Sequence, residues 1–118
     1  MERIKPEQPK EEKIYKIVEE TFNMLKNLEK DGKILILEEE KIKEKIKEMF
    51  RKESEKKIEI EQSFWEAFLS AKEFLEAGIK ENLIEIQGKG EKEKEANRQL
   101  LIERLRGEIY KFRSYKEL

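Results

Sequence analysis

Apolar residues recur every three or four positions along most of this chain, between residues that are almost all charged. That spacing places them along one side of an α-helix. It predicts four helices. The first three cover residues 11–31, 38–56 and 63–78, and the fourth runs from Glu91 or Glu95 to Tyr115. Since 118 residues suffice for one core and not for two, we expect a mainly α, four-helix bundle-like single domain.

Charged residues make up 47% of the chain, yet the formal net charge is only −1. A chain this charged can be disordered, but the balance of charges and the regular apolar spacing favour a folded domain with a charged surface. Lysine and glutamate dominate, which is the pattern described for hyperthermophiles. Both residues are also good helix formers. We therefore expect a thermophilic source, with a purely helical bias in composition as the alternative explanation.

Proline and glycine indicate where the helices start and stop. Both prolines lie in residues 1–10 and predict an extended lead-in there, which leaves residues 11–118 as the helical domain. Gly32 follows the first helical stretch at the position where a left-handed residue ends many helices. Gly107 lies inside the fourth stretch and indicates a bend or a close contact between helices, because glycine is unfavourable there.

Three short apolar segments are ambiguous: residues 34–37, 58–60 and 83–87. Each is too short for its structure to be assigned from periodicity alone. They either pair into a minor β element beside the helices or form apolar connections beneath the ends of the bundle. No internal repeat is evident in the sequence.

The third predicted helix, SFWEAFLSAKEFLEAG, holds four aromatic residues, among them the only tryptophan, Trp65. Ser63 followed by Glu66 has the pattern of a capping box, in which both side chains bind free amides at a helix start, and Gly78 marks the end. Small alanines lie among large rings over a broad arc, which favours a central helix enclosed by the other three. If part of this surface stays uncovered, Trp65 is the candidate hydrophobic anchor for a partner.

The residue types that carry most enzyme chemistry are missing or unfavourably placed. Cysteine and histidine are absent, so the chain lacks thiolate nucleophiles, the usual proton shuttle and the commonest transition-metal ligand. GKGEKEK at residues 88–94 does not have the spacing of a phosphate-binding loop. The glutamates lie mostly on the charged sides of the predicted helices, where no burial shifts their pKa. We expect no catalytic, cofactor-binding or metal-binding residue and no enzymatic activity.

The longest apolar run covers only residues 34–37, which is far shorter than a membrane span. The start of the chain also lacks the apolar stretch of a signal peptide. We therefore expect a cytoplasmic protein that has no membrane partner.

The C-terminal stretch is the best candidate contact surface, because it combines cations with aromatic side chains. Six residues are the candidates there: Arg104, Arg106, Tyr110, Lys111, Arg113 and Tyr115. Arginine and aromatic rings are typical of protein interfaces, and they also bind phosphates and stack on bases. A purely structural role is the third interpretation, since cations are favoured near a helix C-terminus. We favour a small non-enzymatic interaction or scaffolding protein that binds a protein partner or self-associates into a homo-oligomer. A nucleic-acid-binding accessory protein is the alternative.

Overall fold

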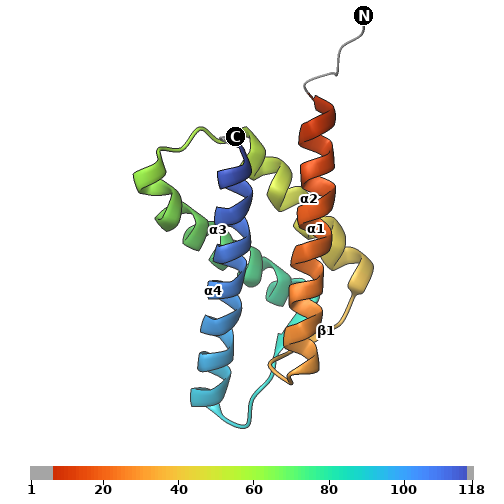
Figure 1. The fold of residues 1–118 in the computed structure, drawn as a ribbon. Helices are drawn as coiled ribbons and strands as arrows, with labels where there is room; N and C mark the ends of the chain where they lie inside the picture. The colour runs from red at the N-terminus through yellow and green to blue at the C-terminus, as the bar shows by residue number, and fades with distance from the viewer. Residues whose placement is uncertain (1–6, 117–118) are drawn as a thin grey trace, which may run out of the picture.

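The structure is a computed structural model that describes residues 7–116, without the side chains of residues 7–10, 60, 115 and 116. In these residues the chain forms four helices and two three-residue strands (Figure 1). Their order is α1 (Glu7–Lys30), β1 (Ile34–Ile36), α2 (Glu39–Glu55), α3 (Ile60–Lys80), β2 (Ile84–Ile86) and α4 (Glu91–Lys116). The helices pack against one another, which confirms a mainly α, bundle-like domain.

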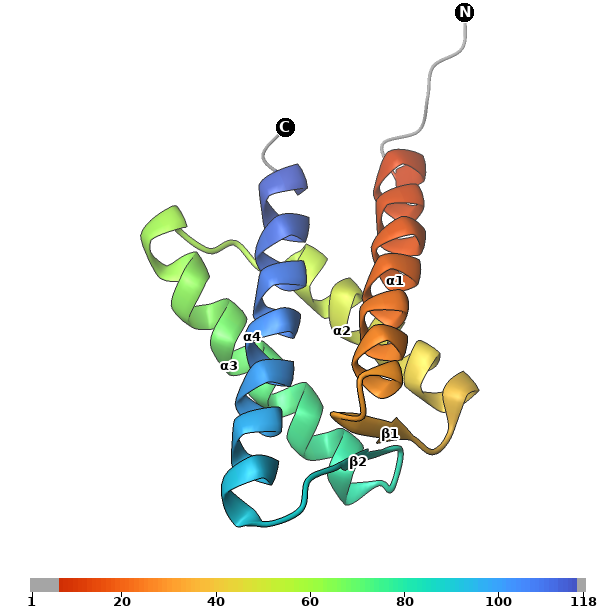
Figure 2. The same ribbon diagram turned by 60° about the horizontal axis from the view of Figure 1, so that its bottom comes forward.

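The strands β1 and β2 form a two-stranded antiparallel sheet. Figure 2 shows them side by side at the end of the molecule away from the start of α1 and the end of α4. The Leu37 N–H continues the ladder by donating to the carbonyl oxygen of Leu83 at 2.8 Å. Of the two alternatives for residues 34–37 and 83–87, the β element is therefore the correct one, with strands at Ile34–Ile36 and Ile84–Ile86. The sheet ties the first half of the chain to the second.

Each strand follows a helix that ends in the same way. Gly32 after α1 and Asn82 after α3 are left-handed, with φ of 76° and 60°. In both cases the amide of the next residue donates to the carbonyl oxygen five positions earlier, at 2.9 Å and 2.8 Å. This hydrogen bond defines the Schellman motif. The order helix, left-handed cap, strand and helix thus occurs twice. The sequence conceals this repeat because Gly and Asn both tolerate the cap, and few other positions need the same side chain.

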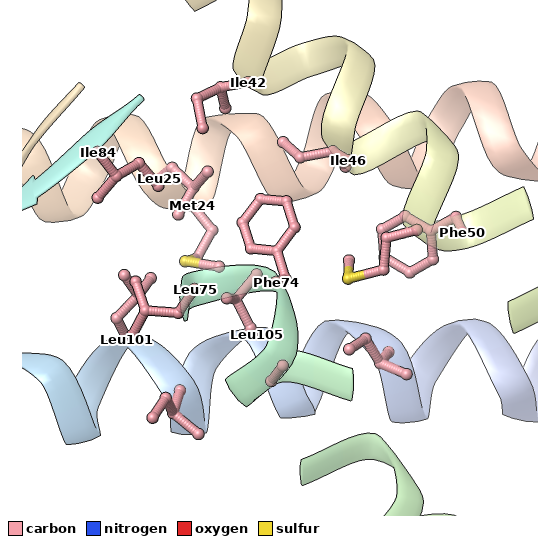
Figure 3. Packing of buried hydrophobic residues seen from close by; sticks show 14 of the residues in the cluster. Met24, Leu25, Ile42, Ile46, Phe50, Phe74, Leu75, Ile84, Leu101 and Leu105 are labelled. Atoms are coloured by element: carbon pink, nitrogen blue, oxygen red, sulfur yellow. The ribbon is translucent and has the colours of Figure 1, made fainter. Parts of the chain in front are cut away.

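The core lies between the helices and receives large side chains from all four. Figure 3 shows some of them together with Ile84 of β2: Met24, Leu25, Ile42, Ile46, Phe50, Phe74, Leu75, Leu101 and Leu105. Within this core the ring of Phe50 meets the ring of Phe112 edge to face, with centroids 5.1 Å apart. Full burial of one such side chain stabilises a fold by about 1.5–3 kcal/mol. The contact between Phe50 and Phe112 therefore helps to hold α2 and α4 together.

The helix α3 begins three residues earlier than expected. Its first residue is Ile60, so the strand alternative for residues 58–60 is wrong, and so is the capping box. Ser63 lies inside the helix and is buried, where it cannot cap. Residues 58 and 59 belong to the irregular connection between α2 and α3, and only Ile60 is helical. An alternation of three residues is too short to specify a strand by itself. The helix also continues past Gly78 as far as Lys80.

The helix α1 also starts earlier than expected. It begins at Glu7, so the last four residues of the predicted lead-in, residues 1–10, are helical. Pro9 is the third residue of this helix. Amides of the first turn have no partner within a helix, so a proline there removes no hydrogen bond. Residues 1–6 lie outside the described part of the chain.

The N-terminal half of α3 is not enclosed by the other helices. Phe64, Trp65 and Leu69 are exposed, whereas Ala67 and Ala71 are buried. The helix packs mainly against α4, and Figures 1 and 2 both place its first turns at the edge of the molecule, away from α1. The expectation of a central, enclosed helix is therefore wrong for this half. The small alanines form the contact and allow close approach of the helices, which turns the large rings towards solvent.

Gly107 is a glycine in the interior of the helix α4. It is exposed, and a Cβ atom built on it would have no neighbouring atom within 4 Å, so the close helix contact expected there is wrong. Gly107→Ala is expected to raise the free energy of unfolding by about 1 kcal/mol, because alanine is the better helix former. Gly32→Ala is the matched control: the left-handed φ of 76° should make the same change destabilising by about 1 kcal/mol. Urea unfolding measures both, and two shifts of the same sign would contradict this account.

Candidate functional site: the aromatic face

The exposed rings of α3 form one surface together with two side chains of α4, and we call this surface the aromatic face. It consists of Phe64, Trp65, Phe68, Leu69, Arg106 and Tyr110. Trp65 is 60% exposed and Phe64 is 53% exposed, while Leu69 and Tyr110 are each 40% exposed. Positions three and four residues apart are neighbours on a helix surface. The four residues of α3 therefore make a continuous apolar ridge.

Ring contacts hold the aromatic face in place. The rings of Trp65 and Phe68 stack with centroids 5.4 Å apart, and Phe64 meets Tyr110 edge to face at 6.3 Å. The guanidinium of Arg106 lies 4.2 Å from the centre of the Phe64 ring. Such a cation–π contact contributes about 0.5–1 kcal/mol at an exposed site. These contacts fix the orientation of the side chains, while the outer surfaces of the rings stay exposed to solvent.

Two of the six predicted C-terminal contact residues, Arg106 and Tyr110, belong to the aromatic face, as does Trp65. Arg104 is exposed as well. It precedes Arg106 by two residues, which places it about 200° around the helix and so on another side. The side chain of Tyr115 lies outside the described residues.

Lys111 is committed to ion pairs within the fold. Its Nζ lies 2.8 Å from an oxygen of Glu20 in α1 and 3.4 Å from one of Glu108 in α4. The contact with Glu20 is the main reason why the pKa of Lys111 is raised above its ordinary value. The side chain therefore links α1 to α4 and offers an outside partner a charge that is already balanced.

Arg113 is not on the surface, so its prediction as a contact residue is wrong. It is only 8% exposed. Its Nε donates to Oε1 of Glu53 at 2.9 Å, and its Nη2 donates to the same oxygen. Its Nη1 donates to the carbonyl oxygen of Ser63 at 2.6 Å. The signal was present in the sequence: Arg113 follows Ile109 by four positions, on the apolar side of α4.

Glu53 is a buried carboxylate, only 2% exposed, which corrects the expectation that the glutamates lie on charged sides. Its second oxygen accepts hydrogen bonds from Ser70 Oγ at 2.6 Å and from Lys56 Nζ at 2.9 Å. Burial on its own raises the pKa of this carboxyl group, but the hydrogen bonds from Ser70, Lys56 and Arg113 outweigh burial and lower it. The sequence signal was its place three positions after Phe50, in the apolar stripe of α2.

The Glu53 network joins α2, α3 and α4. The carboxylate accepts hydrogen bonds from Ser70 of α3 and from Arg113 of α4. Arg113 and Lys56 also place positive charge next to it. Because Glu53, Ser70 and Arg113 come from three different helices, the network helps to fix how these helices cross.

A groove of about 750 Å³ between α1 and α2 is a second surface feature, which the sequence did not reveal. We call it the acidic groove, and the charged residues that line it are Glu11, Glu12, Glu19, Glu40, Lys43, Glu44 and Lys47. Each of these charges is unremarkable in the sequence. Their convergence depends on how α1 and α2 pack side by side.

Among the side chains that the structure describes, no group of three or more acidic residues is arranged to hold a metal ion. In the same part of the chain, no helix combines the length and the apolar character needed to cross a bilayer. Comparisons of the chain with models of known protein families, with curated proteins and with solved structures found no match. The aromatic face and the acidic groove are therefore the features from which function has to be inferred.

Proposed function

We propose that this protein is a small, non-enzymatic scaffolding protein that self-associates through its aromatic face. The observation that carries this proposal is the exposure of Trp65, Phe64 and Leu69 in one ridge on α3. Contiguous exposed apolar surface on a soluble domain marks an interaction site. Trp, Tyr and Arg are also the residues that dominate binding energy at protein interfaces, and all three occur in this face.

The size of the aromatic face suits a dimer of two identical chains. Aromatic side chains bury about 150–250 Å² each when they are fully covered, so the exposed fractions correspond to roughly 400 Å² per copy. Two copies would bury about 800 Å² from these side chains alone. A specific interface buries at least about 1,000 Å², so the residues around the ridge would supply the remainder. A ridge that is mostly uncharged can pack on a second copy of itself about a two-fold axis without placing like charges together.

The nucleic-acid alternative has less support. It relied on Arg104, Arg106, Lys111 and Arg113, but Arg113 is buried and Lys111 is paired with two glutamates. Two arginines remain, and one of them lies over the ring of Phe64. The affinity of a protein for nucleic acid depends on many contacts with phosphates. Two arginines provide few such contacts.

Sedimentation equilibrium over a range of protein concentrations tests the proposed self-association. We expect a dimer, and we expect Trp65→Ser to weaken it by about tenfold or more, as for the anchor residue of an interface. Because Trp65 is the only tryptophan, its fluorescence should move to shorter wavelength as the dimer forms. Tyr15→Ser is the matched control, since Tyr15 is 67% exposed on α1, outside the aromatic face.

A monomer at all concentrations, or an equal effect of the two serine variants, would show that the aromatic face does not mediate self-association. Titration of a labelled single-stranded oligonucleotide at low salt tests the alternative in parallel. Tight binding that weakens steeply with salt and is lost in an Arg104→Ala, Arg106→Ala double variant would favour the nucleic-acid function.

A further inference from the structure

The acidic groove has an apolar floor as well as charged borders. Ile14, Tyr15, Val18 and Phe22 of α1 contribute the apolar part. Ile14 is fully buried, Val18 and Phe22 are half-buried, and Tyr15 projects into solvent. These four residues follow one another at steps of one, three and four along α1, so they form a single strip along the groove.

The borders of the groove are strongly negative although the whole chain is nearly neutral. Five glutamates and two lysines line it, which gives a local formal charge of −3, against −1 for all 118 residues. One of the lysines is already engaged: Nζ of Lys43 lies 4.7 Å from the centre of the Phe22 ring and 3.7 Å from an oxygen of Glu40. The excess of negative charge therefore faces any molecule that enters the groove.

Three of the glutamates are available to an outside partner. Glu12, Glu19 and Glu44 form no ion pair with any other residue that the structure describes. By contrast, Oε1 of Glu11 in α1 lies 3.9 Å from Nη2 of Arg51 in α2. All three are exposed. Like charges gathered on a surface repel one another, and a positively charged partner relieves that repulsion.

The length of the groove defines the shape of its occupant. Its lining on α1 runs from Glu11 to Asn23, which spans about 18 Å at 1.5 Å per residue. This corresponds to about three turns of a helix laid along the groove. An amphipathic helix in a groove places apolar side chains at steps of three and four on the floor and its polar side chains at the borders.

We propose that the acidic groove binds a basic amphipathic helix of a partner protein. Tyr15, Val18 and Phe22 receive the apolar side chains of that helix, and Glu12, Glu19 and Glu44 pair with its lysines or arginines. This site is separate from the aromatic face, because the groove lies between α1 and α2 whereas the aromatic face lies on α3 and α4 (Figure 1). A self-associating scaffold would thus present one such groove on each copy.

The test uses the full chain and a fluorescein-labelled 18-residue peptide that has leucine at helical steps of three and four and lysine at all other positions. Fluorescence anisotropy should show one peptide bound per chain, with an affinity that falls as salt rises. Replacing Glu12, Glu19 and Glu44 together by glutamine should weaken binding by about eightfold, since each exposed ion pair contributes a factor of about two. Tyr15→Ser should weaken binding as well.

Matched controls distinguish binding in the acidic groove from non-specific attraction of a basic peptide to acidic residues elsewhere on the surface. Changing Glu55, Glu91 and Glu103 to glutamine removes the same charge from exposed positions outside the groove, so the affinity for the peptide should stay unchanged. A peptide with glutamate in place of lysine should not bind. Trp65→Ser should bind the lysine peptide normally even if it no longer dimerises, which keeps this test independent of self-association.

Amide chemical shifts locate the bound peptide directly. We expect the changes at residues 11–23 and 40–47, along the two walls of the groove. Failure of the lysine peptide to bind, equal losses in the two glutamine triple variants, or shift changes confined to other helices would each overturn the proposal.

Discussion

Replacing Glu53 by alanine is expected to lower the free energy of unfolding by about 3–5 kcal/mol, because it leaves a buried arginine without its counter-charge. Glu53 and Arg113 are both buried and join α2 to α4. The guanidinium would keep its bond to the Ser63 carbonyl oxygen and lose both bonds to the carboxylate. Ser70 would lose its acceptor as well. Chemical denaturation with a fitted m-value measures the change.

Two further variants separate the cost of a broken pair from the worth of the intact pair. Glu55→Ala removes an exposed glutamate from the same helix and should change stability by no more than about 0.5 kcal/mol. Glu53→Leu combined with Arg113→Met replaces both charges with apolar groups, and it should recover most of the loss, since a buried pair is often no better than a well-packed apolar one. If Glu53→Ala were as mild as Glu55→Ala, the buried network would not hold the helices together.

The lowered pKa of Glu53 also makes stability depend on pH. Burial raises this pKa, but the hydrogen bonds from Ser70, Lys56 and Arg113 bring it below the ordinary value of 4.5. The unfolded chain then binds the proton more readily than the folded one, so stability rises with pH in this range. The contribution of Glu53 is complete above about pH 4.5 and is lost as the pH falls through the folded pKa. The wild type should therefore lose more stability than Glu53→Gln between neutral pH and pH 3, which unfolding curves at several pH values measure.

Phe50→Ala is expected to destabilise the protein by about 3–5 kcal/mol, as for other large aromatic residues removed from a core. The Phe50 side chain is fully buried between α2 and α4, and its ring meets Phe112. Trp65→Ala is the matched comparison, because it removes an even larger ring from a mostly exposed position. At protein concentrations too low for dimerisation, it should cost only about 1 kcal/mol, chiefly the stacking with Phe68. Equal losses in the two variants, measured by the same denaturation, would mean that α3 is enclosed after all.

The comparison of Phe50 with Trp65 shows where sequence reasoning fails. The sequence places both in amphipathic helices, and the aromatic content of α3 favours Trp65 as the core residue. Periodicity identifies an apolar side of a helix but not which neighbour covers it. The apolar arc of α3 is broader than the contact that α4 and α2 provide, so the part with the small Ala67 and Ala71 is buried and the ridge with Trp65 is not. Of the aromatic face, the sequence thus indicated Trp65 as a possible anchor and Arg106 and Tyr110 as possible contact residues, but it did not indicate that the three lie on one surface.

The local properties of the chain were determined by the sequence alone. For the short segments 34–37, 58–60 and 83–87 the sequence left strands and apolar connections as alternatives, but the spacing of apolar residues predicted four helices and Gly32 marked the end of the first. These features depend on neighbours within a few positions, so they can be read from the sequence. The tertiary structure decided the pairing of Glu53 with Arg113, the exposure of Trp65 and the convergence of glutamates in the acidic groove. Each of these depends on which helices lie side by side, because burial and charge pairing arise between segments that are far apart in the chain.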